Sequence, residues 1–119
     1  MVLILDDDER VTEYIGLVLE GLGAQYCRFH SADAAMERYK AGGIRAVVMD
    51  VHLPGNASGL DIAKAMRRTQ PHLPILFVTG LGDPQNVALL RQHGDYLQKE
   101  FFFDTAQERL AQLVARIHT

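Results

Sequence analysis

VLIL (residues 2–5), followed at once by three aspartates (6–8), is the stretch that decides the fold of this chain. Four consecutive apolar residues are typical of a strand that is buried on both faces, as strands in parallel sheets are. A second run of this kind, AVVM (46–49), also stops at an acid, Asp50. The repeated pattern predicts parallel, buried strands that present carboxylates at their carboxyl ends.

Three further segments complete a predicted sheet of five strands. ILFVT (75–79) is a third apolar run, and QYCRFH (25–30) and DYLQ (95–98) are weaker strand patterns. Between the strands, apolar residues recur every three or four positions, which is the spacing of one helix face. This alternation predicts βαβ units in a three-layer α/β/α fold, with helices on both faces of a parallel sheet. With five strands, we expect the flavodoxin-like, doubly wound strand order 2-1-3-4-5.

Capping residues and apolar stripes mark five helices between and after these strands. Ser31 and Ser58 are predicted N-caps, because their side chains can accept hydrogen bonds from a first helical turn. Asp83 before Pro84 predicts an N-cap followed by a proline in the first helical position. Asp104, with a glutamine three residues later, resembles a capping box. The apolar stripes lie within 11–22, 32–39, 59–66, 87–90 and 110–117.

Length and composition limit the classes of function. The chain has 119 residues, of which 48% are hydrophobic, so we expect one domain, 1–119, with a substantial core. A formal net charge of −3 argues against direct nucleic-acid binding or an anionic membrane surface as its main task. One cysteine excludes an internal disulfide, and the sequence has neither a secretory signal nor a long apolar segment. We therefore expect a cytoplasmic location and no membrane association.

Polar residues end or follow four of the predicted strands. Asp6 and Asp7 follow the first strand, Asp50 the third, Thr79 ends the fourth and Lys99 follows the fifth. In an open parallel sheet, ligands bind beyond the carboxyl ends of the strands, where the strand order reverses. Clustered carboxylates suit Mg²⁺, which binds oxygen ligands and commonly shares its shell with a phosphate. A carboxylate nucleophile, with an ammonium and a hydroxyl to stabilise the transferred group, predicts formation of an aspartyl phosphate.

The segments LILDDD, VVMDVHLPG, LFVTG and YLQKEF together resemble the receiver domain of two-component response regulators, which is CheY-like, and the resemblance covers the whole chain. It implies that Asp50 accepts a phosphoryl group from a histidine kinase or a histidine phosphotransfer protein. It also implies a signalling domain rather than an enzyme, with only self-phosphorylation and self-dephosphorylation as chemistry. The residues alone do not select Asp50 as the nucleophile.

The resemblance further assigns roles around the acceptor. It implies that Asp7, Asp50 and the backbone carbonyl of His52 bind Mg²⁺ directly, and that Asp6 binds it through a water molecule. It implies that Lys99 contacts the phosphoryl oxygens.

The resemblance also implies a switch formed by Thr79 and Tyr96. Thr79 would move toward the phosphoryl group, and Tyr96 would rotate inward with it. The movement would alter the surface formed by the fourth helix, the last strand and the final helix. The resemblance implies that this surface binds partners and forms a homodimer.

Two positions depart from the family pattern. Glu100 stands where receiver domains usually have a proline after the lysine, which puts the exact position of Lys99 in doubt. Leu81, two residues after Thr79, cannot orient an attacking water, so we expect slow self-dephosphorylation.

Alternative interpretations remain at this stage. Asp6 and Asp8 have the Asp-x-Asp spacing of Mg²⁺-dependent phosphohydrolases, although Arg10 stands where those enzymes prefer threonine or valine. The other alternative is a degenerate receiver that binds partners without being phosphorylated, which Glu100 would favour. The sequence also leaves open whether the chain is a single-domain regulator or a receiver cut from a longer protein.

Overall fold

A five-stranded, all-parallel sheet forms the centre of the molecule, in the order β2-β1-β3-β4-β5. The computed structural model describes residues 1–53, 55, 58–80, 84–99 and 102–117, except the side chains of 84–87 and 102–104. Both the number of strands and their order are as predicted. The strands are β1 (Val2–Leu5), β2 (Tyr26–Phe29), β3 (Ala46–Asp50), β4 (Ile75–Thr79) and β5 (Asp95–Gln98).

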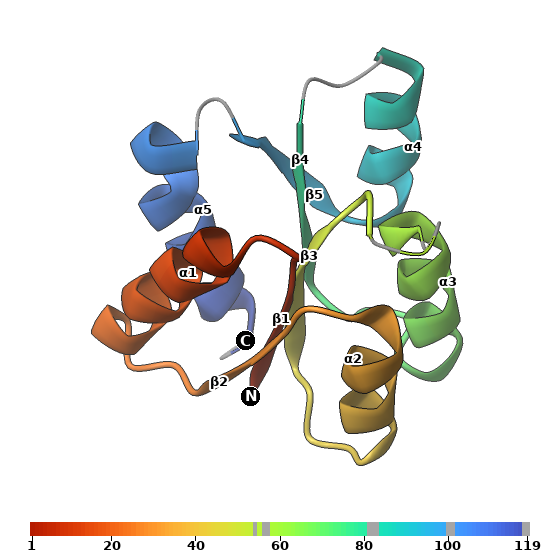
Figure 1. Cartoon of the computed structure of the whole chain (residues 1–119), viewed down its shortest axis with the longest axis horizontal. Helices are drawn as coiled ribbons and strands as arrows, with labels where there is room; N and C mark the ends of the chain where they lie inside the picture. Colours follow the sequence, from red (N-terminus) through yellow and green to blue (C-terminus); the bar gives the residue numbers. More distant parts are fainter. Residues whose placement is uncertain (54, 56–57, 81–83, 100–101, 118–119) are drawn as a thin grey trace.

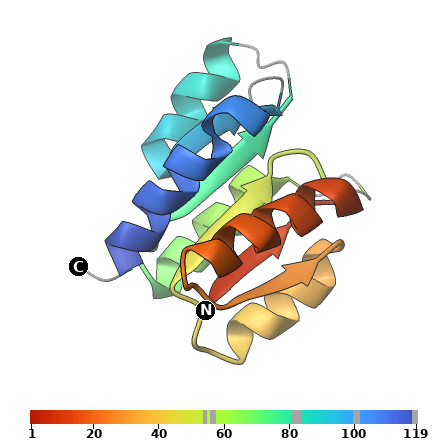
Figure 2. The ribbon, with the colours of Figure 1, turned by 90° about the vertical axis from the view of Figure 1, so that its left-hand side faces the viewer.

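Helices cover both faces of this sheet, so the fold has three layers (Figure 1). On one face α1 and α5 lie side by side (Figure 2), and α2, α3 and α4 cover the other. Residues of β1, β3 and β4 alternate between two separate cores: Leu5 and Phe77 pack in one, Ile4 and Val78 in the other. The helices are α1 (Glu9–Gly21), α2 (Ala32–Lys40), α3 (Gly59–Thr69), α4 (Pro84–His93) and α5 (Phe102–Ile117).

The register of the strands aligns their polar ends at one edge. Leu5 pairs with Met49, so the residues that follow them, Asp6 and Asp50, leave the sheet beside each other. On the next two strands, Thr79 pairs with Gln98, and Lys99 comes directly after it. The fold therefore collects the polar strand ends at the edge where the sequence predicted a site.

Helix ends differ from the predictions more than strands do. Ser31 caps α2, with its Oγ accepting a hydrogen bond from the backbone N–H of Ala34 at 3.3 Å. Ser58 occupies the N-cap position of α3 but its side chain makes no capping hydrogen bond, so that part of the prediction is wrong. Leu22 was predicted on the inward face of the first helix, yet it follows α1 and is exposed.

The start of the last helix is also corrected. It begins at Phe102, so Asp104 lies inside α5 and is not an N-cap. Aromatic residues lower helix propensity only slightly, and helix starts are poorly defined by sequence, so nothing before Asp104 prevents helix formation. The predicted start of α4 at Pro84 is confirmed, while Asp83 lies outside the described residues.

Candidate functional site

Three aspartates meet where β1 and β3 end. Asp6 directly follows β1, Asp7 is next in the chain, and Asp50 is the last residue of β3. Each offers one carboxylate oxygen, and these three oxygens all lie within 4.8 Å of one another. Asp6 and Asp50 are only 2% and 5% exposed, whereas Asp7 faces solvent. The structure thus brings together the three acids that the sequence placed at this edge.

Lys99 supplies the positive charge among these acids. Its Nζ donates a hydrogen bond to Oδ2 of Asp50 at 2.9 Å and lies 3.3 Å from Oδ2 of Asp6. Burial lowers the pKa of the Lys99 ammonium, but the hydrogen bond to Asp50 and the charges of both acids outweigh this effect and raise it. Lys99 therefore remains charged, and one cation neutralises part of a cluster of three carboxylates.

Asp6 is the acid whose protonation the fold changes most clearly. Burial raises the pKa of Asp6 to about 6, and the charge of Asp50 contributes in the same direction. Its Oδ1 accepts a hydrogen bond from the backbone N–H of Asp8 at 2.9 Å, which opposes the increase. Its Oδ2 is buried and accepts no hydrogen bond from the described part of the chain. The ammonium of Lys99, 3.3 Å away, offsets part of the cost of burying this charged oxygen.

The acidic cluster fits a hard divalent cation. The sign of this is the cluster itself, in which three carboxylates share the single charge of Lys99, and the exposed carboxylate of Asp7 leaves the cluster open to solvent. Oxygen ligands in this number suit Mg²⁺, which keeps several of its waters. At the rim, the backbone N–H of His52 donates to Oδ1 of Asp50 at 3.2 Å, and the His52 side chain is exposed.

A glycine that the sequence did not single out controls the position of Asp50. Gly59 begins α3 and donates its N–H to the backbone carbonyl of Val51 at 2.7 Å. A Cβ atom at this position would collide with the backbone carbonyl oxygen of Asp50 and would lie 3.0 Å from Cα of Val51. Only glycine allows α3 to approach the end of β3 this closely. A contact of this kind depends on packing distances and leaves no pattern in the sequence.

The two residues of the predicted switch lie toward the other face of the sheet. Tyr96 packs against the core that contains Ile75 and Phe77, and it pairs with Phe77 on β4. Thr79, which is buried, lies two residues after Phe77, so strand alternation places it on that same face. Asp50 lies two residues after Val48, whose side chain packs in the other core, so strand alternation places Asp50 on the opposite face of the sheet. The structure thus places Thr79 and Tyr96, the two residues of the predicted switch, on one face of neighbouring strands, with α4 beside them.

The carboxylate of Asp8 is occupied elsewhere. Asp8 is the N-cap of α1, and its Oδ1 accepts a hydrogen bond from the backbone N–H of Arg10 at 3.0 Å. The described acidic cluster contains Asp6, Asp7 and Asp50 but not Asp8. An Asp-x-Asp phosphohydrolase site built on Asp6 and Asp8 is therefore not supported by this geometry.

Comparison with known proteins identifies the family. The sequence model of the response regulator receiver domain matches residues 2–114. The chain belongs to this family. Receiver domains are signalling modules of two-component systems, and they interact with histidine kinases or phosphotransfer proteins.

Relatives of this receiver domain are longer proteins. Nodulation protein W of Bradyrhizobium diazoefficiens is 32% identical over 85% of the chain, and the transcriptional regulatory protein FixJ of the same organism is 30% identical over 84%. The chain spans less than half of each relative, 45% and 49% respectively.

Solved structures confirm the CheY-like fold of this receiver domain. A candidate response regulator from Chloroflexus aurantiacus is 33% identical, with a TM-score of 0.81, over 98% of this chain and 94% of that one. A receiver domain protein from Clostridium thermocellum has the same TM-score at 24% identity, over 97% of this chain and 94% of that one.

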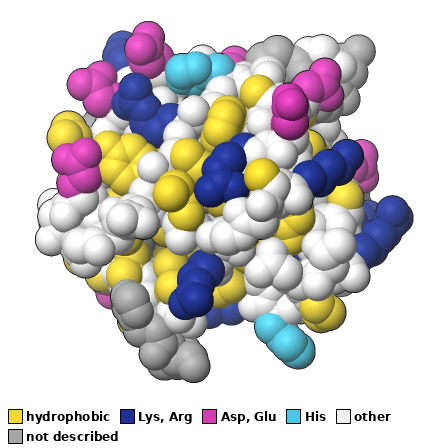
Figure 3. Space-filling view, turned by 90° about the horizontal axis from the view of Figure 1, so that it is seen from below, with side chains coloured by type: hydrophobic (Ala, Val, Ile, Leu, Met, Phe, Trp, Pro, Cys, Tyr) yellow, Lys and Arg dark blue, Asp and Glu magenta, His cyan; other side chains and the backbone are white. Residues whose placement is uncertain are grey.

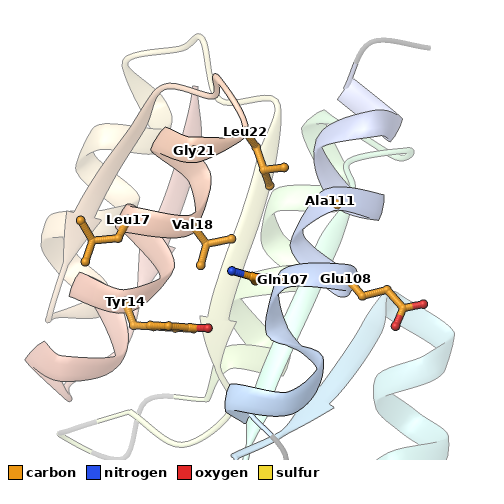
Figure 4. Close-up of a pocket in the computed structure, with 8 residues that line it drawn as sticks. All are labelled: Tyr14, Leu17, Val18, Gly21, Leu22, Gln107, Glu108 and Ala111. Atoms are coloured by element: carbon orange, nitrogen blue, oxygen red, sulfur yellow. The ribbon is translucent and has the colours of Figure 1, made fainter.

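Away from the acidic edge, the receiver domain has two other surfaces of note. At the opposite edge, Lys and Arg side chains are spread over the face, from its centre to its margins, whereas the acids lie mainly in the upper part of the view (Figure 3). Cations in the last turns of α2 to α5 complement the helix dipoles, which explains this distribution. A groove of about 630 Å³ lies between α1 and α5, lined by residues such as Tyr14, Leu17 and Gln107 (Figure 4).

Some predictions fall outside what the structure describes. Glu100 and Leu81 lie among the residues that are not described, so the effect of Glu100 on the position of Lys99 and the effect of Leu81 on dephosphorylation stay predictions. None of the helices among the described residues has the length and apolar character needed to cross a membrane.

Proposed function

We propose that this chain is a phosphoacceptor: Asp50 takes a phosphoryl group from a phosphohistidine on a kinase or a phosphotransfer protein. The observation that carries this proposal is the position of Asp50, which ends β3 with Lys99 at 2.9 Å and two further carboxylates beside it. We also propose that residues 1–119 form one receiver domain and that it acts in the cytoplasm.

The transfer would proceed by attack of an Asp50 carboxylate oxygen on phosphorus. An O–P bond forms, the P–N bond of the phosphohistidine breaks, and the imidazole nitrogen leaves with the electron pair. Lys99 would release its hydrogen bond to the free carboxylate and donate to a phosphoryl oxygen instead, which stabilises the developing negative charge. The hydroxyl of Thr79 would donate to a second phosphoryl oxygen.

Mg²⁺ bound by Asp7, Asp50 and the carbonyl of His52, with Asp6 acting through a water molecule, would neutralise the acids and the transferred group. The excess of three carboxylates over the one ammonium of Lys99 supports a cation at this place. Before transfer, the same acids repel an incoming phosphoryl group, because Lys99 alone balances less than half of their charge.

The consequence of transfer would be a change in the surface formed by α4, β5 and α5. Movement of Thr79 toward the phosphoryl group would let Tyr96 rotate inward along the same face of the sheet. We propose that partners, including a second copy of the chain, recognise this surface.

The groove between α1 and α5 is a candidate contact surface for the protein donor. Leu17 is 59% exposed on its wall, although it is a large aliphatic residue, and Leu22 is also exposed (Figure 4). Both helices begin near the acidic edge, since α1 follows the three aspartates and α5 follows Lys99. Glu13 and Glu20 flank Leu17 by helical spacing. A donor helix with aliphatic and basic residues would suit this groove.

Intact mass spectrometry after incubation with acetyl phosphate tests the proposal. We expect a gain of one phosphoryl group in the presence of Mg²⁺, no gain without Mg²⁺, and no gain in Asp50→Asn. Asp61→Asn, which removes an exposed carboxylate from α3, is the matched control and should behave as the wild type. Steady release of phosphate without a stable adduct would favour a hydrolase, and the absence of any adduct would favour a degenerate receiver.

A further inference from the structure

Arg91 and Tyr96 form a contact that neither the sequence pattern nor the family membership assigns. The guanidinium carbon of Arg91, in the last turn of α4, lies 5.2 Å from the centroid of the Tyr96 ring on β5. Its Nη2 donates a long hydrogen bond, 3.4 Å, to the Tyr96 hydroxyl. A cation within about 6 Å of an aromatic face is attracted by the ring. The ring of Tyr96 is therefore held by α4 through both its face and its hydroxyl.

The surroundings of Tyr96 make this contact consequential. The ring is half-buried and packs against the core that includes Phe77, whereas Arg91 is exposed. The backbone N–H of Tyr96 donates to Oδ1 of Asp95 at 2.9 Å, and Asp95 forms an ion pair with Arg109 of α5 at 2.7 Å. The backbone of β5 is thus fixed toward α5, while the tyrosine ring is held toward α4. Rotation of the ring would break the contact with Arg91 and leave the backbone in place.

We propose that Arg91 is a positioning residue that holds Tyr96 in its unphosphorylated orientation and so opposes the switch. This inference rests on the proposed function, because it concerns the response of Tyr96 to a phosphoryl group on Asp50. Inward rotation of Tyr96 requires loss of the cation–π contact and of the hydroxyl hydrogen bond.

The orientation of Tyr96 and the binding of a phosphoryl analogue at Asp50 are thermodynamically linked, so a change at Arg91 should be measurable at Asp50. A contact made only in the unphosphorylated orientation favours that orientation by a certain factor. By the same factor it weakens the binding of any ligand that requires the other orientation. An exposed cation–π contact corresponds to a factor of about two to five. Removing Arg91 should therefore tighten the binding of a phosphoryl analogue at Asp50, although Arg91 does not belong to the site.

A simpler role for Arg91 is to complement the dipole of α4, since it lies in the last turn of that helix. Arg91→Lys separates the two roles. A lysine keeps the positive charge at the helix terminus but lacks the planar guanidinium that stacks on a ring. If only the dipole matters, Arg91→Lys should behave as the wild type. If Arg91 positions Tyr96, the beryllium trifluoride concentration that half-saturates Arg91→Lys should lie between the values for the wild type and for Arg91→Ala.

The experiment is a titration of the full chain with beryllium trifluoride in Mg²⁺, followed by ¹⁹F NMR of fluorotyrosine. The chain has four tyrosines and no tryptophan, so a Tyr96→Phe variant assigns the Tyr96 resonance directly. We expect half-saturation of Arg91→Ala at about two- to fivefold lower beryllium trifluoride than the wild type. We also expect the Tyr96 resonance of the free variant to shift toward its saturated position.

Arg68→Ala is the matched control. Arg68 is an exposed arginine in the last turn of α3, and it makes no hydrogen bond or ion pair with the part of the chain that the structure describes. If Arg91→Ala and Arg68→Ala were half-saturated at the same concentration of beryllium trifluoride, the positioning role of Arg91 would be overturned, and the proposed phosphoacceptor function would stand. A wild-type chain that fails to respond to beryllium trifluoride would overturn the proposed phosphoacceptor function, and the inference with it.

Discussion

The Nζ atom of Lys99 lies 2.9 Å from Oδ2 of Asp50 and shares its charge with Asp6, 3.3 Å away. One ammonium from the end of β5 therefore bridges two buried carboxylates from β1 and β3. This arrangement makes Lys99 structural in the free chain, and in the proposed function it would become available to the phosphoryl group after transfer. It also means that the stability of the fold and the chemistry of the edge depend on the same three side chains.

Lys99→Met should destabilise the metal-free protein at pH 7 by about 1–3 kcal/mol. Breaking a buried pair costs more than this, but the Lys99 side chain is 31% exposed, which screens part of the interaction. Urea unfolding measures the change. Lys64→Met, on the exposed face of α3, is the control and should stay within about 0.5 kcal/mol of the wild type. Equal effects of the two substitutions would contradict a bridging role for Lys99.

The raised pKa of Asp6 predicts a stability that depends on pH. The pKa of Asp6 rises from 3.8 to about 6 on folding, so the native state keeps a proton that the unfolded chain loses between these values. The native state binds more protons in this window, and the free energy of unfolding must fall as the pH rises through it. Charged Asp6 is thus unfavourable at pH 7 without a metal.

Asp6→Asn should accordingly stabilise the metal-free protein at pH 7 by about 1–3 kcal/mol, because an amide carries no charge to bury. The gain should shrink as the pH falls from 7 to 4, where the wild-type carboxyl is itself neutral. Urea titrations at several pH values measure it, and Asp33→Asn, on the exposed side of α2, controls for the loss of one charge. A variant less stable than the wild type at pH 7 would refute the prediction.

The sequence predicted the sheet and the site more closely than the helix ends. Fully apolar runs such as VLIL and AVVM leave little choice of structure, because strands buried on both faces contain few other residue types. Once the strand order is known, Asp6, Asp50 and Lys99 must meet, since strand ends share one edge. The start of α5 before Asp104 was missed because several neighbouring residues could begin a helix equally well.

Contacts that depend on distances between elements could not be predicted from the sequence. Gly59 looked like one more position on the inward face of α3, and nothing in its neighbours indicates the approach to the carbonyl of Asp50. The pairing of Arg91 with Tyr96 likewise requires knowledge of how α4 lies over β5. Such contacts decide how the site is held, although they do not decide the fold.

Gly59→Ala should destabilise the protein by about 1–3 kcal/mol, since the new Cβ forces α3 away from the end of β3. It should also slow phosphorylation by acetyl phosphate, because Asp50 moves with its backbone. Gly21→Ala is the control: this glycine ends α1, and a Cβ there meets nothing within 4 Å. An unchanged rate together with unchanged stability in Gly59→Ala would show that the close approach is unimportant.

Asp7→Asn should separate metal binding from stability. Asp7 is exposed, so we expect the metal-free variant to unfold within about 0.5 kcal/mol of the wild type. The increase in melting temperature with added Mg²⁺ should need at least about tenfold more metal, because one of three carboxylates has gone. Glu13→Gln, an exposed acid on α1, should keep the wild-type response. Similar Mg²⁺ responses in both variants would place the metal elsewhere.

Leu17→Glu should impair phosphorylation by a protein donor and spare phosphorylation by acetyl phosphate. A charge on the α1 wall of the apolar groove would disfavour a docked helix, and loss of an apolar contact there should slow transfer by about tenfold or more. The donor is a phosphorylated kinase or phosphotransfer protein that phosphorylates the wild-type chain. Leu89→Glu is the matched control, because Leu89 is also an exposed leucine, at 43%, but lies on α4. If Leu89→Glu alone slowed the transfer, the donor would contact α4 and not the groove. If both substitutions slowed acetyl phosphate as well, the loss would come from the fold and not from docking.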